Sequence, residues 1–185
     1  MQPLNVLTVC QEPGNEKDLV QIVDDAKTFF PTEAWYDVRY LGELSLEHDL
    51  KIMAGDETCG AFLLKKLLKR FQKVKDSSGL TGLLLGITPK PVIDLYYSFE
   101  GGNLKKTVFF VQDYVSKKIG VVSLFRLTRE SSSKVVAHGL GHNQDLHHHL
   151  EPTDLMHSEL LRISHLEVDG FCNLCLRSLT RDGAS

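Results

Sequence analysis

Histidines spaced along residues 138–149 are the side chains of this chain best suited to metal chemistry. His138 and His142 are four residues apart, and His147, His148 and His149 follow shortly after. Side chains four apart on a helix project from one face, one turn apart. Both imidazoles can therefore reach one tetrahedral ion at ~2.0–2.1 Å, and a third ligand must come from the chain beyond the helix. The alternative is a histidine-rich surface loop that binds metal only adventitiously.

The length and composition are those of an ordinary folded domain. With 185 residues, 42% of them hydrophobic and 24% charged, the chain is expected to fold as one domain with a sizeable core. The net charge of −3 predicts no general affinity for nucleic acid or acidic membranes. The longest apolar stretch, 79–87, is too short to cross a bilayer, and residues 1–5 lack the basic region of a secretory signal.

The cysteines are used in a pattern that is more typical of metal binding than of a disulfide framework. Cys10 and Cys59 are isolated, whereas Cys172 and Cys175 form a C-x-x-C pair. This usage fits a reducing compartment, so we expect a cytoplasmic protein. A redox role for the pair is less favoured, because no thioredoxin-like strand precedes it.

Hydrophobic periodicity predicts an α+β (mixed α/β) fold. Helices are expected over 16–30, 56–75 and 130–145, and strands over 3–10, 35–41, 80–88, 92–99 and 107–112, followed by a further apolar segment over 119–127. The basic face of the helix over 56–75 is interpreted as a solvated outer face rather than as a surface for membrane or nucleic acid. We expect a mixed twisted sheet of about five strands within 1–145, together with the histidine helix, and a small C-terminal subdomain over 146–185.

The residues around the histidines resemble the archaemetzincins, a small family of metzincin-type zinc proteins. The metzincin signature H-E-x-x-H-x-x-G-x-x-H falls with its three ligands on His138, His142 and His148. Met156 lies eight residues beyond His148, where the family has its Met-turn methionine. The terminal C-x-x-C and the segments 85–88 and 121–127 also match, so the resemblance covers residues 80–179.

The resemblance implies a metzincin-like (zincin-like) fold with one zinc on the three histidines and a second, structural zinc. His149 and Asp154 stand where the family has its first cysteine pair, and with Cys172 and Cys175 they could hold the second ion. His157 and His165 are reserve ligands for that site. Met156 would form an apolar floor beneath the histidines without binding the metal.

The departures from the family pattern bear directly on catalysis. Gly139 stands where the signature has its glutamate, and Asp145 stands where it has a turn glycine, a position that Asp tolerates at modest cost. The glutamate acts as general base, a role that typically supplies ~10²–10⁴-fold in rate. Other carboxylates near the motif in sequence are those of Glu130, Asp145 and Glu151, and no known geometry places any of them as a substitute.

Three functions are therefore expected in descending order. The first is a zinc-binding protein of metzincin fold with impaired catalysis, which could bind peptides along the strand over 107–112. The second is an active, aminopeptidase-like zinc peptidase that uses another base, and the third is a non-catalytic structural or interaction protein. If the site is otherwise intact, Gly139→Glu is expected to raise activity by orders of magnitude.

Overall fold

The computed structural model describes residues 2–10, 16–31, 34–162 and 168–181. Within these ranges the elements are β1 (Gln2–Cys10), α1 (Glu16–Lys27), β2 (Trp35–Ser45), β3 (Leu50–Ala54), β4 (Glu57–Leu63), α2 (Leu64–Ser77), β5 (Leu83–Thr88), β6 (Val92–Glu100), β7 (Asn103–Phe110), β8 (Asp113–Val115), β9 (Ile119–Ser123), α3 (Arg129–Asn143), a 3-10 turn over Leu160–Arg162, and α4 (Asn173–Arg181). The predicted mixed α/β fold class is confirmed. None of the helices in the described part of the chain is long and apolar enough to cross a bilayer.

A five-stranded sheet in the order β2-β1-β5-β9-β8 forms the centre of the molecule. Its first four strands are parallel, whereas the short edge strand β8 runs antiparallel to β9, with Asp113 paired to Val122. The antiparallel edge strand contacts α3, which carries two of the predicted histidine ligands. The sheet therefore ends at the candidate site.

Alternating side chains divide the core between the two faces of this sheet. Leu83, Leu85 and Ile87 of β5 pack with the residues of α1 and α3, whereas Leu84 packs with those of α2 on the opposite face. All residues of β5 are buried, as expected for a central parallel strand covered on both sides.

A second, four-stranded sheet in the order β3-β4-β6-β7 was not expected. The prediction of a helix from residue 56 is wrong in its first part, because residues 57–63 form β4 and the helix begins at Leu64. A two-residue turn at Gly55 and Asp56 joins β3 to β4, with Gly55 at a φ of 69°. Such a turn is a hairpin signal in the sequence, but the strong helical periodicity of the residues after it favours a helix from residue 56.

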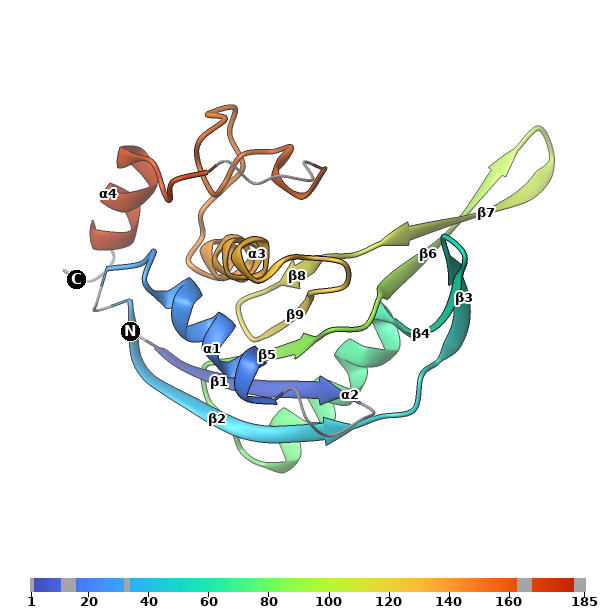
Figure 1. Ribbon diagram of the computed structural model, residues 1–185, viewed down its shortest axis with the longest axis horizontal. Coiled ribbons are helices and arrows are strands. Elements are labelled where there is room, and N and C mark those ends of the chain that lie inside the picture. The colour runs from blue at the N-terminus through green and yellow to red at the C-terminus, as the bar shows by residue number, and fades with distance from the viewer. Residues whose placement is uncertain (1, 11–15, 32–33, 163–167, 182–185) are drawn as a thin grey trace.

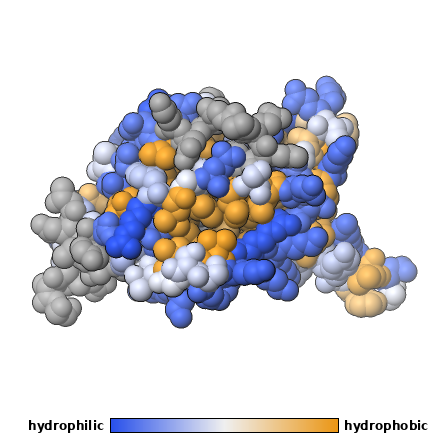
Figure 2. Space-filling model, turned by 90° about the horizontal axis from the view of Figure 1, so that it is seen from below, coloured by the Kyte–Doolittle hydropathy of each residue, from blue (hydrophilic) through white to orange (hydrophobic). Residues whose placement is uncertain are grey.

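The hairpin of β6 and β7 projects from the body of the molecule (Figure 1). It exposes large apolar side chains, namely Tyr96, Tyr97, Phe99, Leu104, Val108, Phe109 and Phe110. Figure 2 shows a separate apolar area in the middle of the face that lies below β2 and α2 in Figure 1, surrounded by hydrophilic side chains.

Helix α3 is enclosed between the sheet and the C-terminal segment (Figure 1). The Thr128 side chain caps its first turn by accepting a hydrogen bond of 3.2 Å from the Ser131 N–H. Most of its side chains are buried, so the helix lacks a pronounced polar face. Since packing surrounds it, α3 can hold its histidines in fixed positions.

Candidate metal centre

Two histidines on α3 have their ring orientations fixed by backbone carbonyls. His138 Nδ1 lies 2.6 Å from the Leu155 carbonyl oxygen, and His142 Nδ1 lies 3.2 Å from that of Leu146. A carbonyl oxygen can only accept a hydrogen bond, so both Nδ1 atoms carry the proton. Each Nε2 is then an unprotonated lone-pair donor, the form in which a neutral imidazole binds metal.

The Nε2 atoms of His138, His142 and His148 converge on one point. They lie 3.1 Å, 3.0 Å and 3.2 Å apart, and the first of these distances joins two nitrogens without a proton between them. Three ligands at ~2.0–2.1 Å from a tetrahedral ion would be about 3.3 Å apart. The observed spacing is slightly shorter and fits a cation in the middle, which would relieve the repulsion between the lone pairs.

The charge states of these rings suit metal binding as well. Burial lowers the pKa of His138 to about 4, and burial with the neighbouring His138 also lowers the pKa of His142. Both imidazoles are therefore neutral at pH 7. Metal binding at these two residues does not have to displace a proton.

The turn and the floor around the histidines follow the predicted positions. Asp145 has a φ of 62°, the left-handed conformation expected where the family has glycine. Met156 is fully buried, and a Cβ on Gly141 would lie 2.7 Å from its sulfur. The thioether therefore packs directly against α3 at Gly141, the residue before His142, and a side chain at 141 would have to displace it.

A carboxylate that the sequence reasoning missed faces Gly139. A Cβ on Gly139 would lie 3.3 Å from Asp113 Oδ2 and 2.9 Å from Val115 Cγ2, both on β8. Asp113 Oδ2 also lies 3.9 Å from His138 Nε2, and the Asp113 side chain is only 6% exposed. Burial raises the pKa of Asp113 to about 6, against the opposing influence of His142 and His148. Asp113 is 25 residues before the motif, so no local spacing could indicate it.

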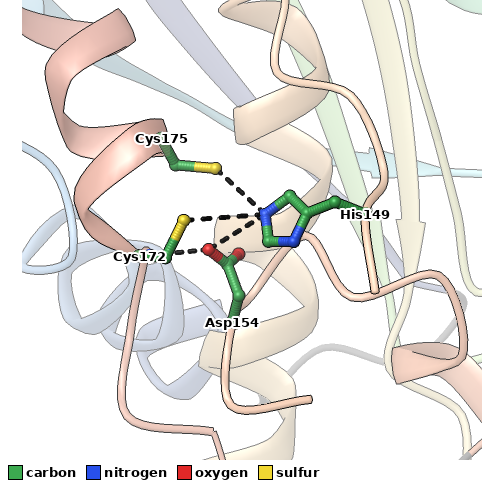
Figure 3. A group of neighbouring side chains, drawn as sticks. All are labelled: His149, Asp154, Cys172 and Cys175. Atoms are coloured by element: carbon green, nitrogen blue, oxygen red, sulfur yellow. Dashed lines mark hydrogen bonds and ion pairs between the residues drawn. The ribbon is translucent and has the colours of Figure 1, made fainter. Parts of the chain in front are cut away.

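A second group of possible metal ligands lies in the C-terminal segment, where His149, Asp154, Cys172 and Cys175 point toward one another (Figure 3). His149 Nε2 is 3.1 Å from Asp154 Oδ2, 3.3 Å from Cys175 Sγ and 3.7 Å from Cys172 Sγ. A tetrahedral zinc with nitrogen, oxygen and sulfur ligands gives separations of about 3.3–3.8 Å. The four predicted residues are thus brought together at distances that suit one ion.

Hydrogen bonds already hold this second group in place. Asp154 accepts hydrogen bonds from the backbone N–H groups of Met156 and Cys172, and His149 Nδ1 accepts one of 3.2 Å from Glu151. Burial raises the pKa of Asp154, but the hydrogen bonds from Cys172 and Met156 outweigh it and leave that pKa below its ordinary value. Burial and the Asp154 carboxylate raise the pKa of the Cys175 thiol.

The remaining candidates lie apart from both groups or outside the described residues. Glu130 is exposed and pairs with Lys134, and Glu151 is exposed as well. His157 pairs with His149 only through a backbone bridge, and the position of His165 is not among the residues that the structure describes.

The strand predicted over 107–112 belongs mostly to β7, an edge of the four-stranded sheet. The edge strand beside the histidines is instead β8. It lines a pocket of about 440 Å³ whose wall includes Asp113, Tyr114, His142 and His148.

Comparison with known proteins supports the fold at the level of structure. The sequence matches no protein-family model and no curated protein at a significant level. Among solved structures, the fold is similar to archaemetzincin from Methanopyrus kandleri, with a TM-score of 0.62 and 19% identity over 99% of this chain and 96% of that one. It is also similar to a zinc-dependent peptidase from Methanocorpusculum labreanum, with a TM-score of 0.61 and 16% identity over 95% of this chain and 99% of the other. These likenesses give the chain the archaemetzincin fold.

Proposed function

We propose that this chain is a zinc protein of archaemetzincin type that binds one ion on His138, His142 and His148 and a second on the C-terminal group. The observation that carries the proposal is the meeting of three Nε2 atoms within 3.2 Å, two of them without protons. The two unprotonated nitrogens of His138 and His142 repel each other at 3.1 Å, and a cation between the three rings would relieve that repulsion. The names of the similar structures, an archaemetzincin and a zinc-dependent peptidase, support zinc as that cation.

The usual route of peptide hydrolysis is impaired at this site, because Gly139 offers no side chain to take up a proton. A zinc ion at the three histidines would lower the pKa of a water ligand and polarise a substrate carbonyl. The histidines provide the metal-binding part of that chemistry, and α3 contributes no carboxylate to the remaining part.

The second zinc site is proposed as structural. Its residues His149, Asp154, Cys172 and Cys175 would complete four-fold coordination and leave no open position, as is usual in structural sites. The described cysteines are free thiols, which supports a reducing, cytoplasmic location.

Peptides are the proposed ligands of the pocket between β8 and the histidines. Among the described residues, strand β8 pairs only with β9, so its other edge can receive an extended peptide by strand addition. This assigns peptide pairing to β8 rather than to the strand predicted over 107–112. Nucleic acid and membranes are not proposed as partners, since the net charge is −3.

A second candidate function is favoured by one specific observation. Asp113 faces Gly139 from β8, so the site is not without a carboxylate. On this alternative the chain is an active zinc peptidase that uses a base from outside the helix.

Zinc stoichiometry tests the proposed metal sites. We expect two zinc ions per chain in purified protein by elemental analysis, and one in His142→Ala. The matched control is His147→Ala, a neighbouring histidine outside both groups, which should retain both ions. Protein that lacks stoichiometric zinc, or an equal loss in both variants, would refute the proposal.

A further inference from the structure

We propose that Asp113 is the general base of this site and that it supplies, from β8, the carboxylate that α3 lacks at Gly139. The inference rests on the zinc site proposed for His138, His142 and His148. It gives the pocket a peptide-hydrolysing activity and a catalytic residue outside the histidine motif.

Gly139 and β8 are complementary in shape. The space that a side chain at 139 would enter is filled by Asp113 and Val115, whose atoms would lie 3.3 Å and 2.9 Å from a Cβ there. Glycine is therefore required by the packing of β8 on α3. The same packing brings the Asp113 carboxylate to the side of α3 on which Gly139 replaces the glutamate of the signature.

The Asp113 carboxylate is buried, and within the described part of the chain one of its oxygens lacks a hydrogen bond. The side chain is 6% exposed, and Oδ2 has no hydrogen-bond partner among the described residues. An unsatisfied buried carboxylate oxygen costs free energy, so its retention calls for a ligand or a chemical role. Asp113 also lines the pocket that His142 and His148 open into.

The position of Asp113 is fixed relative to the histidines. Asp113 pairs with Val122 in the sheet, and Ser123 N–H donates to the Gln112 carbonyl at 2.7 Å on one side of it. On the other side, Asn143 of α3 donates to the Ser116 carbonyl at 2.7 Å. The short edge strand is thus tied to β9 at one end and to α3 at the other, which fixes its position as the placement of a catalytic group requires.

The distances favour a base over a fourth ligand. Asp113 Oδ2 lies 3.9 Å from His138 Nε2, whereas the histidine nitrogens are 3.0–3.2 Å from one another. A water molecule within ~2.6–3.2 Å of Oδ2, the reach of a general base, would also lie beside the histidine cluster.

The other nearby carboxylates are engaged elsewhere. Asp145 lines the same pocket as Asp113, but it forms an ion pair with Lys117 and 64% of its side chain is exposed. Glu130 pairs with Lys134 and is also exposed.

The proposed step is hydrolysis of a peptide bond by water. The water oxygen bonds to the carbonyl carbon while one of its protons passes to Asp113. The same proton then goes to the amide nitrogen as the C–N bond breaks, and a carboxylic acid and an amine are released. Asp113 ends the cycle as a carboxylate, so the step is balanced without any further reactant.

Asp113→Asn tests this role, because it keeps the shape of the side chain and removes the proton acceptor. With zinc-loaded protein and a quenched-fluorescent mixed peptide library, we expect kcat to fall by about 100-fold or more. Glu130→Gln, which removes an exposed carboxylate at the start of α3, should leave kcat unchanged. Asp113→Glu, which retains the carboxylate, should recover part of the rate.

Two readouts without turnover separate a base from a metal ligand. The visible absorption of the cobalt-substituted protein should be the same in wild type and Asp113→Asn. Acetohydroxamate loses a proton when it chelates the metal and would share that proton with Asp113. Its affinity for cobalt-loaded Asp113→Asn should therefore be about tenfold or more below its affinity for cobalt-loaded wild type.

The possible failures are distinguishable. An altered cobalt spectrum in Asp113→Asn would make Asp113 a ligand and overturn its role as base. Equal turnover in Asp113→Asn and wild type would overturn it as well. Wild type that holds two zinc ions yet cleaves no peptide would also refute this inference, while the proposed zinc function would stand. Protein without zinc would defeat both.

Discussion

The two groups of possible metal ligands are neighbours in the chain, at His148 and His149, but they are built in different ways. In the first group, backbone carbonyls hold Nδ1–H of His138 and His142, so that bare lone pairs meet at Nε2. In the second group the arrangement is reversed. Glu151 N–H donates to His149 Nδ1, so in the metal-free form the proton is on Nε2 and can be donated to Asp154.

The difference indicates what each group needs. In the first group two unprotonated nitrogens face each other at 3.1 Å, and His142 and His148 line a pocket. The second satisfies most of its polar atoms by hydrogen bonds and brings together four possible ligands, enough to close the coordination of one ion. Open sites with three protein ligands support chemistry, whereas closed sites with four stabilise the fold. The first group is thus preorganised to bind a metal ion. The second group must first move or release the protons on its ligand atoms.

The largest expected effect is on stability, through the second group. Cys175→Ser should remove one zinc ion and lower the free energy of unfolding by about 4 kcal/mol when free zinc is ~1,000-fold above the dissociation constant. Urea denaturation with parallel zinc analysis measures both. Cys59→Ser, at a half-buried cysteine in β4, is the control and should keep both ions. Equal unfolding curves for the two variants would show that the second group is held by hydrogen bonds alone.

The pH dependence of zinc affinity should differ between the two groups. The pKa of the Cys175 thiol is raised, so binding at the second group near pH 7 releases its proton. Affinity should therefore rise by at least about 10-fold per pH unit, or about 1.4 kcal/mol. The pKa of His138 and that of His142 are lowered, so these imidazoles are already neutral near pH 7. Calorimetry of His142→Ala and Cys175→Ser between pH 6.5 and pH 7.5 isolates each site. Similar slopes in the two variants would contradict the assignment of thiolates to the second group.

Much of the candidate site could be predicted because it is local. The spacing of His138 and His142 requires only a helix, and His148 follows six residues after His142. The central strands were also visible in the sequence, since β5 is an uninterrupted apolar run. The prediction from local patterns failed at β4, because the helical periodicity of α2 was extended backward over the strand that precedes it.

Asp113 could not be found by such reasoning. It is brought to Gly139 by the order of strands in the sheet, in which β8 returns antiparallel beside β9 and reaches α3. Nothing in the spacing of residues 113 and 139 encodes that contact. A buried aspartate at the end of a strand is an ordinary feature until tertiary structure shows an unpartnered oxygen beside three histidines.

The structure revises the expectation that Gly139→Glu restores activity. The new side chain would overlap Val115 and approach the Asp113 carboxylate, so overpacking should lower the free energy of unfolding by about 1–3 kcal/mol. Turnover should not rise. Combining Gly139→Glu with Asp113→Ala and Val115→Ala should relieve the overlap and move the carboxylate back onto α3.

Unfolding curves and turnover together test this exchange. We expect the triple variant to be more stable than Gly139→Glu and to hydrolyse peptides faster than Asp113→Ala. A gain of orders of magnitude in Gly139→Glu alone would mean that β8 yields easily and that its packing does not explain the glycine.

The smallest expected effect concerns the floor of the first group. Met156→Leu conserves most of the side-chain volume, so the free energy of unfolding should fall by no more than about 1.5 kcal/mol, owing to the close contact of the sulfur with Gly141. Because the thioether is not a ligand, both zinc ions should remain. Met53→Leu, at an exposed position in β3, should have no effect on either property. Loss of zinc from the first group alone in Met156→Leu would show that the histidines depend on this contact for their positions. The first group would then be less preorganised for metal than the fixed tautomers of His138 and His142 indicate.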